Sequence, residues 1–150
     1  MVDNQEKEII NVKENPELYI VDNGLKGMYT FEPYKSLLLP LFKYKSQKAA
    51  KRSTEKLLYQ FNKNLGEDFI ACNMCVKYLR AGVIFSRRYN RYGKSGRVYD
   101  ENGERKGMLK IKDRDKEKMD ITRMYEKALK ECVSNEEYKG MKKVFHEKYK

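Results

Sequence analysis

The sequence predicts a mostly helical α+β domain in which a small N-terminal β-hairpin packs on a bundle of about four to five helices. Three observations favour this class. From Ser46 onward, apolar residues recur mainly at helical spacing. The first third instead holds two short β-prone runs on either side of a turn sequence. A chain of 150 residues can bury a core without metals or disulfides, so we expect one basic domain over residues 1–150.

The hairpin is expected between residues 18 and 32. Leu18–Val21 and Met28–Glu32 have the composition of short strands, and Asp22–Gly24 between them is a typical turn sequence. Two other segments, residues 1–12 and 100–115, are polar enough to be a disordered start and a mobile connection.

The first long helix is predicted from Ser46 to Leu65, with Ser46 as its N-cap and Gly66 as its stop. Its apolar residues fall on one side of a helical projection, namely Ala50, Leu57, Leu58, Phe61 and Leu65. The opposite side carries a basic stripe with one tyrosine, made of Lys48, Arg52, Lys56, Tyr59 and Lys63. Such a stripe suits phosphate contact combined with stacking on a base or sugar, and it equally suits a solvated face.

Two further helices are expected next, one over Glu67–Ala81 and a short one from Val83 to about Tyr92, with Gly82 ending or bending the first. In the short helix, Phe85, Tyr89 and Tyr92 share one face, while Arg87 and Arg91 point the other way and Arg88 flanks the aromatic face. The arginine pair would then be available to an outside partner, or would simply form a solvated face.

The C-terminal third predicts two amphipathic helices. The first is marked by Ile121, Tyr125, Ala128, Leu129 and Cys132, and the second by Tyr138, Met141 and Phe145, with a break at Ser134-Asn135. Both have outer faces on which acidic and basic residues balance, as expected of scaffold.

The net charge of +11 is confined to the middle of the chain. Lys43–Tyr99 holds 14 of the 33 basic residues but only three of the 22 acidic ones, which leaves nineteen of each sign elsewhere. From Phe69 to Tyr99 there is no acidic residue at all. A solvated surface usually mixes both signs, so this segment indicates an anionic partner, with solubility as the simpler alternative.

A basic loop rich in glycine follows at Tyr92–Asp100. Its glycines would let the backbone approach a phosphate, and Lys94, Ser95 and Arg97 are suitable donors. Gly93-Lys94-Ser95 matches the end of a P-loop, but Arg88 stands where the earlier glycine is required and the context is helix to loop. We therefore do not expect nucleotide hydrolysis.

Cysteine usage favours a reducing compartment and no metal. Cys72, Cys75 and Cys132 are an odd count in a chain that needs no disulfides. Zinc requires four ligands, and no second pair or histidine cluster completes a site with Cys72 and Cys75, which we predict to be core residues. No segment has about 20 uninterrupted apolar residues and the N-terminus lacks signal-peptide features, so we expect a cytoplasmic protein without membrane contact.

Catalytic chemistry has little support. His146 is the only histidine and lies in a charged C-terminal helix, where a surface or partly packed role is expected. A minor enzymatic hypothesis has arginines and lysines hold a phosphodiester while a tyrosine attacks it. The residues concerned are Arg87, Arg88, Lys94, Arg97, Tyr89, Tyr92 and Tyr99.

Four short motifs resemble a small family of bacterial and viral proteins known as domain of unknown function DUF4385. They are NPELY at 15–19, EPYKS at 32–36, RRY at 87–89 and GRVYD at 96–100. The resemblance extends from about Val12 to the end of the chain. It implies a complete single-domain protein from a phage, a large virus or a bacterium, and it implies no activity.

The sequence therefore predicts a non-catalytic protein that binds DNA or RNA through phosphate contacts, with no cofactor and no metal. The candidate nucleic-acid-binding residues are Lys48, Arg52, Lys56, Tyr59, Arg87, Arg88, Arg91, Lys94, Ser95, Arg97 and Tyr99. The alternative is a protein-interaction module, such as a viral accessory, inhibitory or virion protein, that docks on an acidic partner. Either protein would act in the cytoplasm of a bacterial cell or an infected host cell.

Overall fold

The computed structural model describes residues 9–22, 24–92 and 116–150. Within these ranges the chain forms five α-helices, two 3-10 turns and one two-stranded sheet. In chain order the elements are β1 (Ile10–Asn11), η1 (Pro16–Leu18), β2 (Phe31–Glu32), α1 (Tyr34–Leu38), η2 (Leu39–Leu41), α2 (Gln47–Asn64), α3 (Phe69–Tyr92), α4 (Lys116–Val133) and α5 (Glu136–Tyr149).

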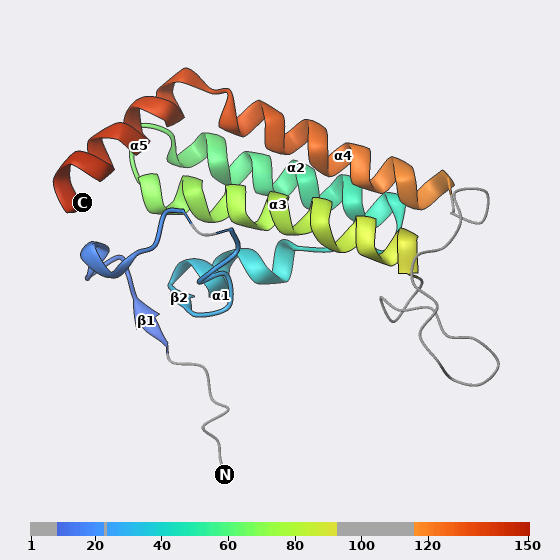
Figure 1. Cartoon of the computed structure of the whole chain (residues 1–150), viewed down its shortest axis with the longest axis horizontal. Helices are drawn as coiled ribbons and strands as arrows, with labels where there is room; N and C mark the ends of the chain where they lie inside the picture. Colours follow the sequence, from blue (N-terminus) through green and yellow to red (C-terminus); the bar gives the residue numbers. More distant parts are fainter. Residues whose placement is uncertain (1–8, 23, 93–115) are drawn as a thin grey trace, which may run out of the picture.

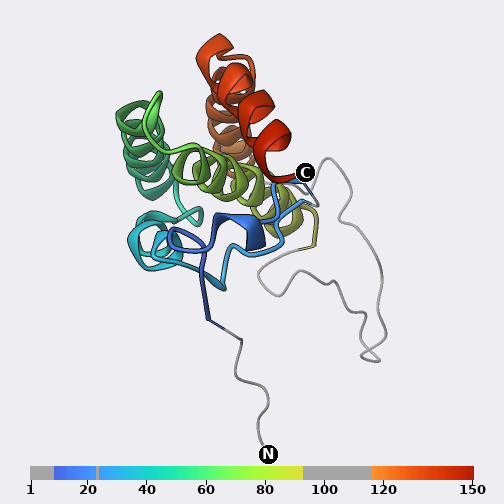
Figure 2. The ribbon, with the colours of Figure 1, turned by 90° about the vertical axis from the view of Figure 1, so that its left-hand side faces the viewer.

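Helix α3 is the centre of the structure. It contacts α1, α2, α4 and α5, and the N-terminal elements lie along one side of it (Figures 1 and 2). Helices α2 and α4 run side by side with α3 and antiparallel to it, while α5 bends away from the end of α4 and descends toward the beginning of α3 (Figure 1). All these helices contribute to one hydrophobic core. The predicted class, a mostly helical α+β fold, is confirmed.

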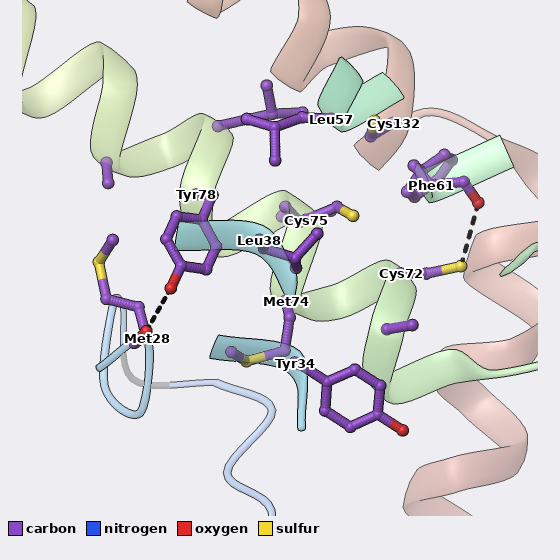
Figure 3. Packing of buried hydrophobic residues seen from close by; sticks show 14 of the residues in the cluster. Met28, Tyr34, Leu38, Leu57, Phe61, Cys72, Met74, Cys75, Tyr78 and Cys132 are labelled. Atoms are coloured by element: carbon purple, nitrogen blue, oxygen red, sulfur yellow. Dashed lines mark hydrogen bonds between the residues drawn. The ribbon is translucent and has the colours of Figure 1, made fainter. Parts of the chain in front are cut away.

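The β-component differs from the expected hairpin. The sheet is parallel, with Ile10 paired to Phe31 and Asn11 to Glu32, and Leu18–Val21 contributes no strand. Side chains of helix α3 instead bind carbonyl oxygens of this segment. Lys77 Nζ donates to the carbonyl oxygens of Ile20 and Lys26 (2.6 Å for Lys26), and the Tyr78 hydroxyl donates to the Met28 carbonyl (Figure 3).

The predicted helix break at Gly82 is also wrong. Helix α3 continues without interruption from Phe69 to Tyr92, so the two helices expected there are one. Gly82 serves packing instead of helix termination. A Cβ atom at this position would lie 2.1 Å from Cδ1 of the Tyr125 ring on α4, so only glycine permits this approach of the two helices.

The ends of the other helices agree with the sequence. The Ser46 hydroxyl accepts a hydrogen bond from the Ala49 amide at the start of α2 (3.1 Å). Gly66 follows the end of α2 with a φ of +77°, which favours glycine. The break between α4 and α5 is confirmed at Ser134-Asn135, where the Asn135 side chain caps α5 by accepting from the Tyr138 amide (2.9 Å).

The apolar composition of α3 follows from its central position. Its segment Phe69–Tyr89 has the length and mean hydropathy, 1.3, of a membrane span, although single polar and charged residues interrupt its apolar run. However, 83% of this window is buried inside the protein. A core helix needs such a composition to contact neighbours on most of its faces, so packing accounts for it.

Residues 9–12 are ordered, in contrast to the expected disorder over residues 1–12. Ile10–Asn11 form β1, and Val12 is completely buried. The expected mobile connection at 100–115 lies outside the described residues, as does the basic loop from Gly93 onward.

The three cysteines are core residues, as predicted for Cys72 and Cys75. All three are free and completely buried, and the Cys72 thiol points at the Phe61 carbonyl (Figure 3). Burial raises the pKa of the Cys72 and Cys132 thiols to about 12 and also raises that of Cys75.

We expect these thiols to react with Ellman's reagent at about pH 8 only after unfolding, because the thiolate is the reactive form and is suppressed in the core. Absorbance of the thiolate that the reagent releases should indicate almost no reacted cysteine in native buffer and three reacted cysteines per chain in concentrated guanidinium chloride. Rapid labelling of one thiol in the native protein would contradict the buried arrangement.

Candidate nucleic-acid interface

The outer face of α2 presents a continuous basic stripe. Five exposed basic side chains occupy it, and Glu55 is the only acidic residue of the helix; the basic residues are Lys48, Lys51, Arg52, Lys56 and Lys63. The opposite face is buried through Ala50, Leu57 and Phe61, so packing on the core fixes which side chains point outward. From Lys48 to Lys63 the stripe is about 22 Å long at the rise of an α-helix.

The cations of this stripe are not neutralised by the rest of the fold. None of the five forms an ion pair or hydrogen bond through its side chain with another residue that the structure describes. Some cations elsewhere have partners, since Arg123 binds Asp120 at 2.9 Å and Lys139 binds Glu136 at 3.1 Å, but a run of five without a partner in the described ranges occurs on α2. The outer face of α2 therefore keeps most of its positive charge, which attracts polyanions.

Tyr59 lies within this stripe and is 63% exposed. It is one helical turn from Glu55, Lys56 and Lys63, which are its neighbours on the helix surface. An exposed aromatic ring among cations can stack on an unpaired base while the cations contact phosphates. The structure thus brings Lys48, Arg52, Lys56 and Tyr59 together as the sequence predicted.

Arg87 is less available than the sequence suggested. Its guanidinium donates to the Glu126 carboxylate on α4 at 2.8 Å, because α3 continues past Gly82 alongside α4. Both side chains are nearly half exposed, so the pair contributes little stability. An approaching phosphate would nevertheless have to compete with Glu126.

Among the described residues, Arg88 does not contact α4 in this way and instead lies against the Phe85 ring of its own helix. It is exposed, and its guanidinium carbon lies 5.8 Å from the centre of the Phe85 ring. Phe85 packs on Tyr44, with ring centres 5.8 Å apart, in the segment that leads into α2. The Phe85 and Tyr44 rings thus connect Arg88 to the segment that carries two exposed lysines, Lys43 and Lys45.

The start of α2 and the end of α3 lie at the same end of the bundle, since both border the first turns of α4. Gln47 donates to the Asp120 carboxylate at 3.4 Å, and the hydroxyls of Ser86 and Thr122 lie 2.7 Å apart. The remaining candidates lie outside the described residues; they are the side chain of Arg91 and all of Lys94, Ser95, Arg97 and Tyr99.

The acidic, cysteine and histidine side chains of the described residues do not cluster in a metal-binding group. No group of three or more His, Cys, Asp or Glu side chains in the described ranges could hold a metal ion. His146 is half-buried, with its Nε2 atom 3.7 Å from the Asp22 carboxylate, so it links α5 to the N-terminal segment. The partly packed role expected for His146 is confirmed.

The comparison with protein families gives one match. The sequence profile of the family described as domain of unknown function (DUF4385) matches residues 3–148. This chain belongs to the DUF4385 family. No curated protein and no solved structure gives a significant match.

In this DUF4385 chain, sequence reasoning missed three basic residues of the interface. Lys51 completes the stripe one turn after Lys48, and helical spacing alone could have included it. Lys43 and Lys45 are different, because the contact between Tyr44 and Phe85 joins their segment to the end of α3 that carries Arg88. That contact joins residues 41 positions apart, which no local pattern reveals.

Proposed function

We propose that this protein binds nucleic acid without a catalytic step, through phosphate contacts made by the outer face of α2. The observation that carries the proposal is the row of five exposed cations on α2, unpaired within the described residues, with Tyr59 among them. A length of about 22 Å matches roughly six phosphates along one strand, each about 3.4 Å of helix axis apart. Arg88, with Lys43 and Lys45, would extend the contacts at one end.

Binding should depend steeply on salt. With about five to eight phosphate contacts, the logarithm of the association constant should fall with the logarithm of salt concentration at a slope of roughly −4 to −7 on duplex DNA. Fluorescence anisotropy with a labelled duplex of about 20 base pairs, at about 50 to 300 mM potassium chloride, measures this slope. No binding at low salt, or a flat salt dependence, would remove the proposal.

The α2 face can be tested with a charge-matched pair of variants. The triple variant Lys48→Gln, Arg52→Gln, Lys56→Gln should weaken binding at least about tenfold and make the salt slope shallower by about 3. The control Lys127→Gln, Lys130→Gln, Lys143→Gln removes the same charge from exposed positions on α4 and α5. It should bind almost as tightly as the parent protein, and equal losses in both variants would show that only net charge matters.

Two single variants report on the details of the same face. Glu55→Gln removes the only carboxylate of α2 and should tighten binding, because that carboxylate repels phosphate. Tyr59→Ala should weaken binding to single strands more than to duplexes, since only unpaired bases can stack on the ring. Equal effects of Tyr59→Ala on both would argue against stacking.

The competing function is docking on an acidic protein. A pull-down with and without nuclease separates the two, because a nucleic-acid complex is lost on digestion and a protein complex survives it. We further propose the cytoplasm of a bacterial cell or an infected host cell as the compartment, supported by the three free thiols.

A further inference from the structure

A second feature lies away from α2, in a polar cavity of about 380 Å³ between the N-terminal segment, α3 and α5. Its volume is within the range of small-molecule sites. The N-terminal segment supplies Asp22, α3 supplies Asn73 and Arg80, and α5 supplies Tyr138 and Lys142. None of its lining residues belongs to α2, so this cavity is distinct from the proposed nucleic-acid face.

Arg80 is the main positive charge in the wall of the cavity. It is half-buried, and its guanidinium forms no ion pair or hydrogen bond with another described residue. Arg87, which is also half-buried, and the exposed Arg123 each bind a carboxylate, at 2.8 and 2.9 Å. Arg80 thus retains five N–H donors in a concave site, arranged in the planar fork that binds carboxylate or phosphate oxygens in pairs.

Tyr138 adds a neutral donor to the same wall. Its hydroxyl oxygen accepts a hydrogen bond from the Asn73 amide at 2.8 Å, and the Asn73 oxygen in turn accepts one from the Tyr19 hydroxyl. The hydrogen of the Tyr138 hydroxyl has no acceptor among the described residues. Burial raises the pKa of this hydroxyl to about 12, so it stays protonated and able to donate at neutral pH.

The rim of the cavity carries charges that are already partnered. Lys142 Nζ lies 3.4 Å from the Asp22 carboxylate, which His146 also contacts at 3.7 Å, and Lys139 binds Glu136. Asp22 is the one acidic residue of the described lining, against three basic ones, so the lining has a net positive charge. Because Asp22 is held by α5, it does not neutralise Arg80.

We propose that this cavity binds a small molecule bearing an oxyanion, a carboxylate or a phosphate monoester, with Arg80 as the paired donor and Tyr138 as the hydroxyl donor. The oxyanion would supply the acceptors that the guanidinium and the hydroxyl lack in the described fold. Lys142 at the rim would add attraction for a dianion. The remainder of the ligand would occupy the space beside Val21, Val76 and Val133.

Thermal unfolding of the full chain in the presence of inorganic phosphate, acetate or chloride at matched ionic strength tests the proposal. Phosphate or acetate should raise the midpoint in a saturable manner that chloride does not reproduce. Whichever of phosphate and acetate binds more tightly identifies the anionic group of the ligand as a phosphate or a carboxylate. If neither oxyanion exceeds chloride, the proposal is overturned.

Variants then locate the site by isothermal titration with the tighter oxyanion. Arg80→Gln should weaken binding at least about tenfold, while Arg123→Gln, an equal charge change on α4, should leave it unchanged. Tyr138→Phe should also weaken binding. If that variant fails to fold because it loses the contact with Asn73, the Arg80→Gln result alone decides the proposal. The α2 triple variant should retain binding, so failure of the nucleic-acid proposal would not affect this one. Unchanged affinity in Arg80→Gln would refute the site.

Discussion

Gly82→Ala is expected to lower the free energy of unfolding by about 3 kcal/mol, although alanine is normally the better helix former. The added Cβ would lie 2.1 to 2.4 Å from three atoms of the Tyr125 ring. The ring cannot move aside easily, because the Tyr125 hydroxyl donates to the Lys43 carbonyl and bonds to the Ser53 hydroxyl at 2.8 Å. Relief of the clash would therefore require α3 and α4 to separate.

Gly140→Ala is the matched control for this substitution. Gly140 also lies inside a helix, α5, but a Cβ there would meet no atom within 4 Å. Alanine should stabilise this helix by up to about 1 kcal/mol. Urea denaturation of both variants measures the difference, and a Gly82→Ala protein as stable as Gly140→Ala would show that α3 and α4 do not approach as described.

Raising the pH from about 10 to 12 is expected to unfold the protein cooperatively. Burial raises the pKa of Tyr125 and Tyr138 to about 12 and raises those of Tyr19, Tyr34 and Tyr78 as well. These hydroxyls stay neutral in the fold at a pH where they ionise in the unfolded chain. Their stabilisation is complete below the ordinary tyrosine pKa of about 10 and is lost as the pH rises towards the folded values.

The size of the effect follows from the number of protons released on unfolding. Each such tyrosine lowers the free energy of unfolding by about 1.4 kcal/mol per pH unit above pH 10. Tyr19, Tyr125 and Tyr138 alone contribute about 4 kcal/mol per unit, so two units approach the whole stability of a typical domain.

Titration of Lys77 changes the free energy of unfolding in the opposite direction, and at lower pH. Burial, with a smaller effect from Arg80, lowers its pKa to about 8, so between about pH 8 and 10.4 the unfolded chain holds a proton that the folded protein lacks. Its contribution to stability rises over that window. The buried thiols of Cys72, Cys75 and Cys132 act like the tyrosines, because their raised pKa keeps them neutral in the fold while they ionise in the unfolded chain above about pH 8.5. We therefore expect the decrease in stability to begin near about pH 9, with Lys77 offsetting part of it up to about pH 10.

Circular dichroism and tyrosinate absorbance should change together in this alkaline transition. Tyr59→Phe, which alters a ring that is 63% exposed, should leave the midpoint unchanged. Ionisation of most of the twelve tyrosines while the helical signal persists would contradict the buried hydroxyl network.

The sequence by itself determined the three long helices α2, α4 and α5, most of the extent of α3, and the composition of the candidate face. Helical spacing placed Ala50, Leu57 and Phe61 inside and Lys48, Arg52 and Lys56 outside, because both sets lie on one helix whose geometry is regular. The cap at Ser46 was recognisable for the same reason, since a cap involves residues three positions apart, and the break at Ser134-Asn135 was recognisable from the end of the helical spacing.

Only the tertiary structure decided contacts between distant segments. Gly82 was expected to end a helix, and its role became clear from the Tyr125 ring that packs against it. The hairpin expected before Pro33 is absent, and carbonyls of that segment bind Lys77 and Tyr78, partners about 50 residues away. The unpaired state of Arg80 within the described fold depends likewise on where α5 and Asp22 lie. Local patterns fix which residues can be helical or exposed, whereas partners across the fold fix what a buried or charged group does.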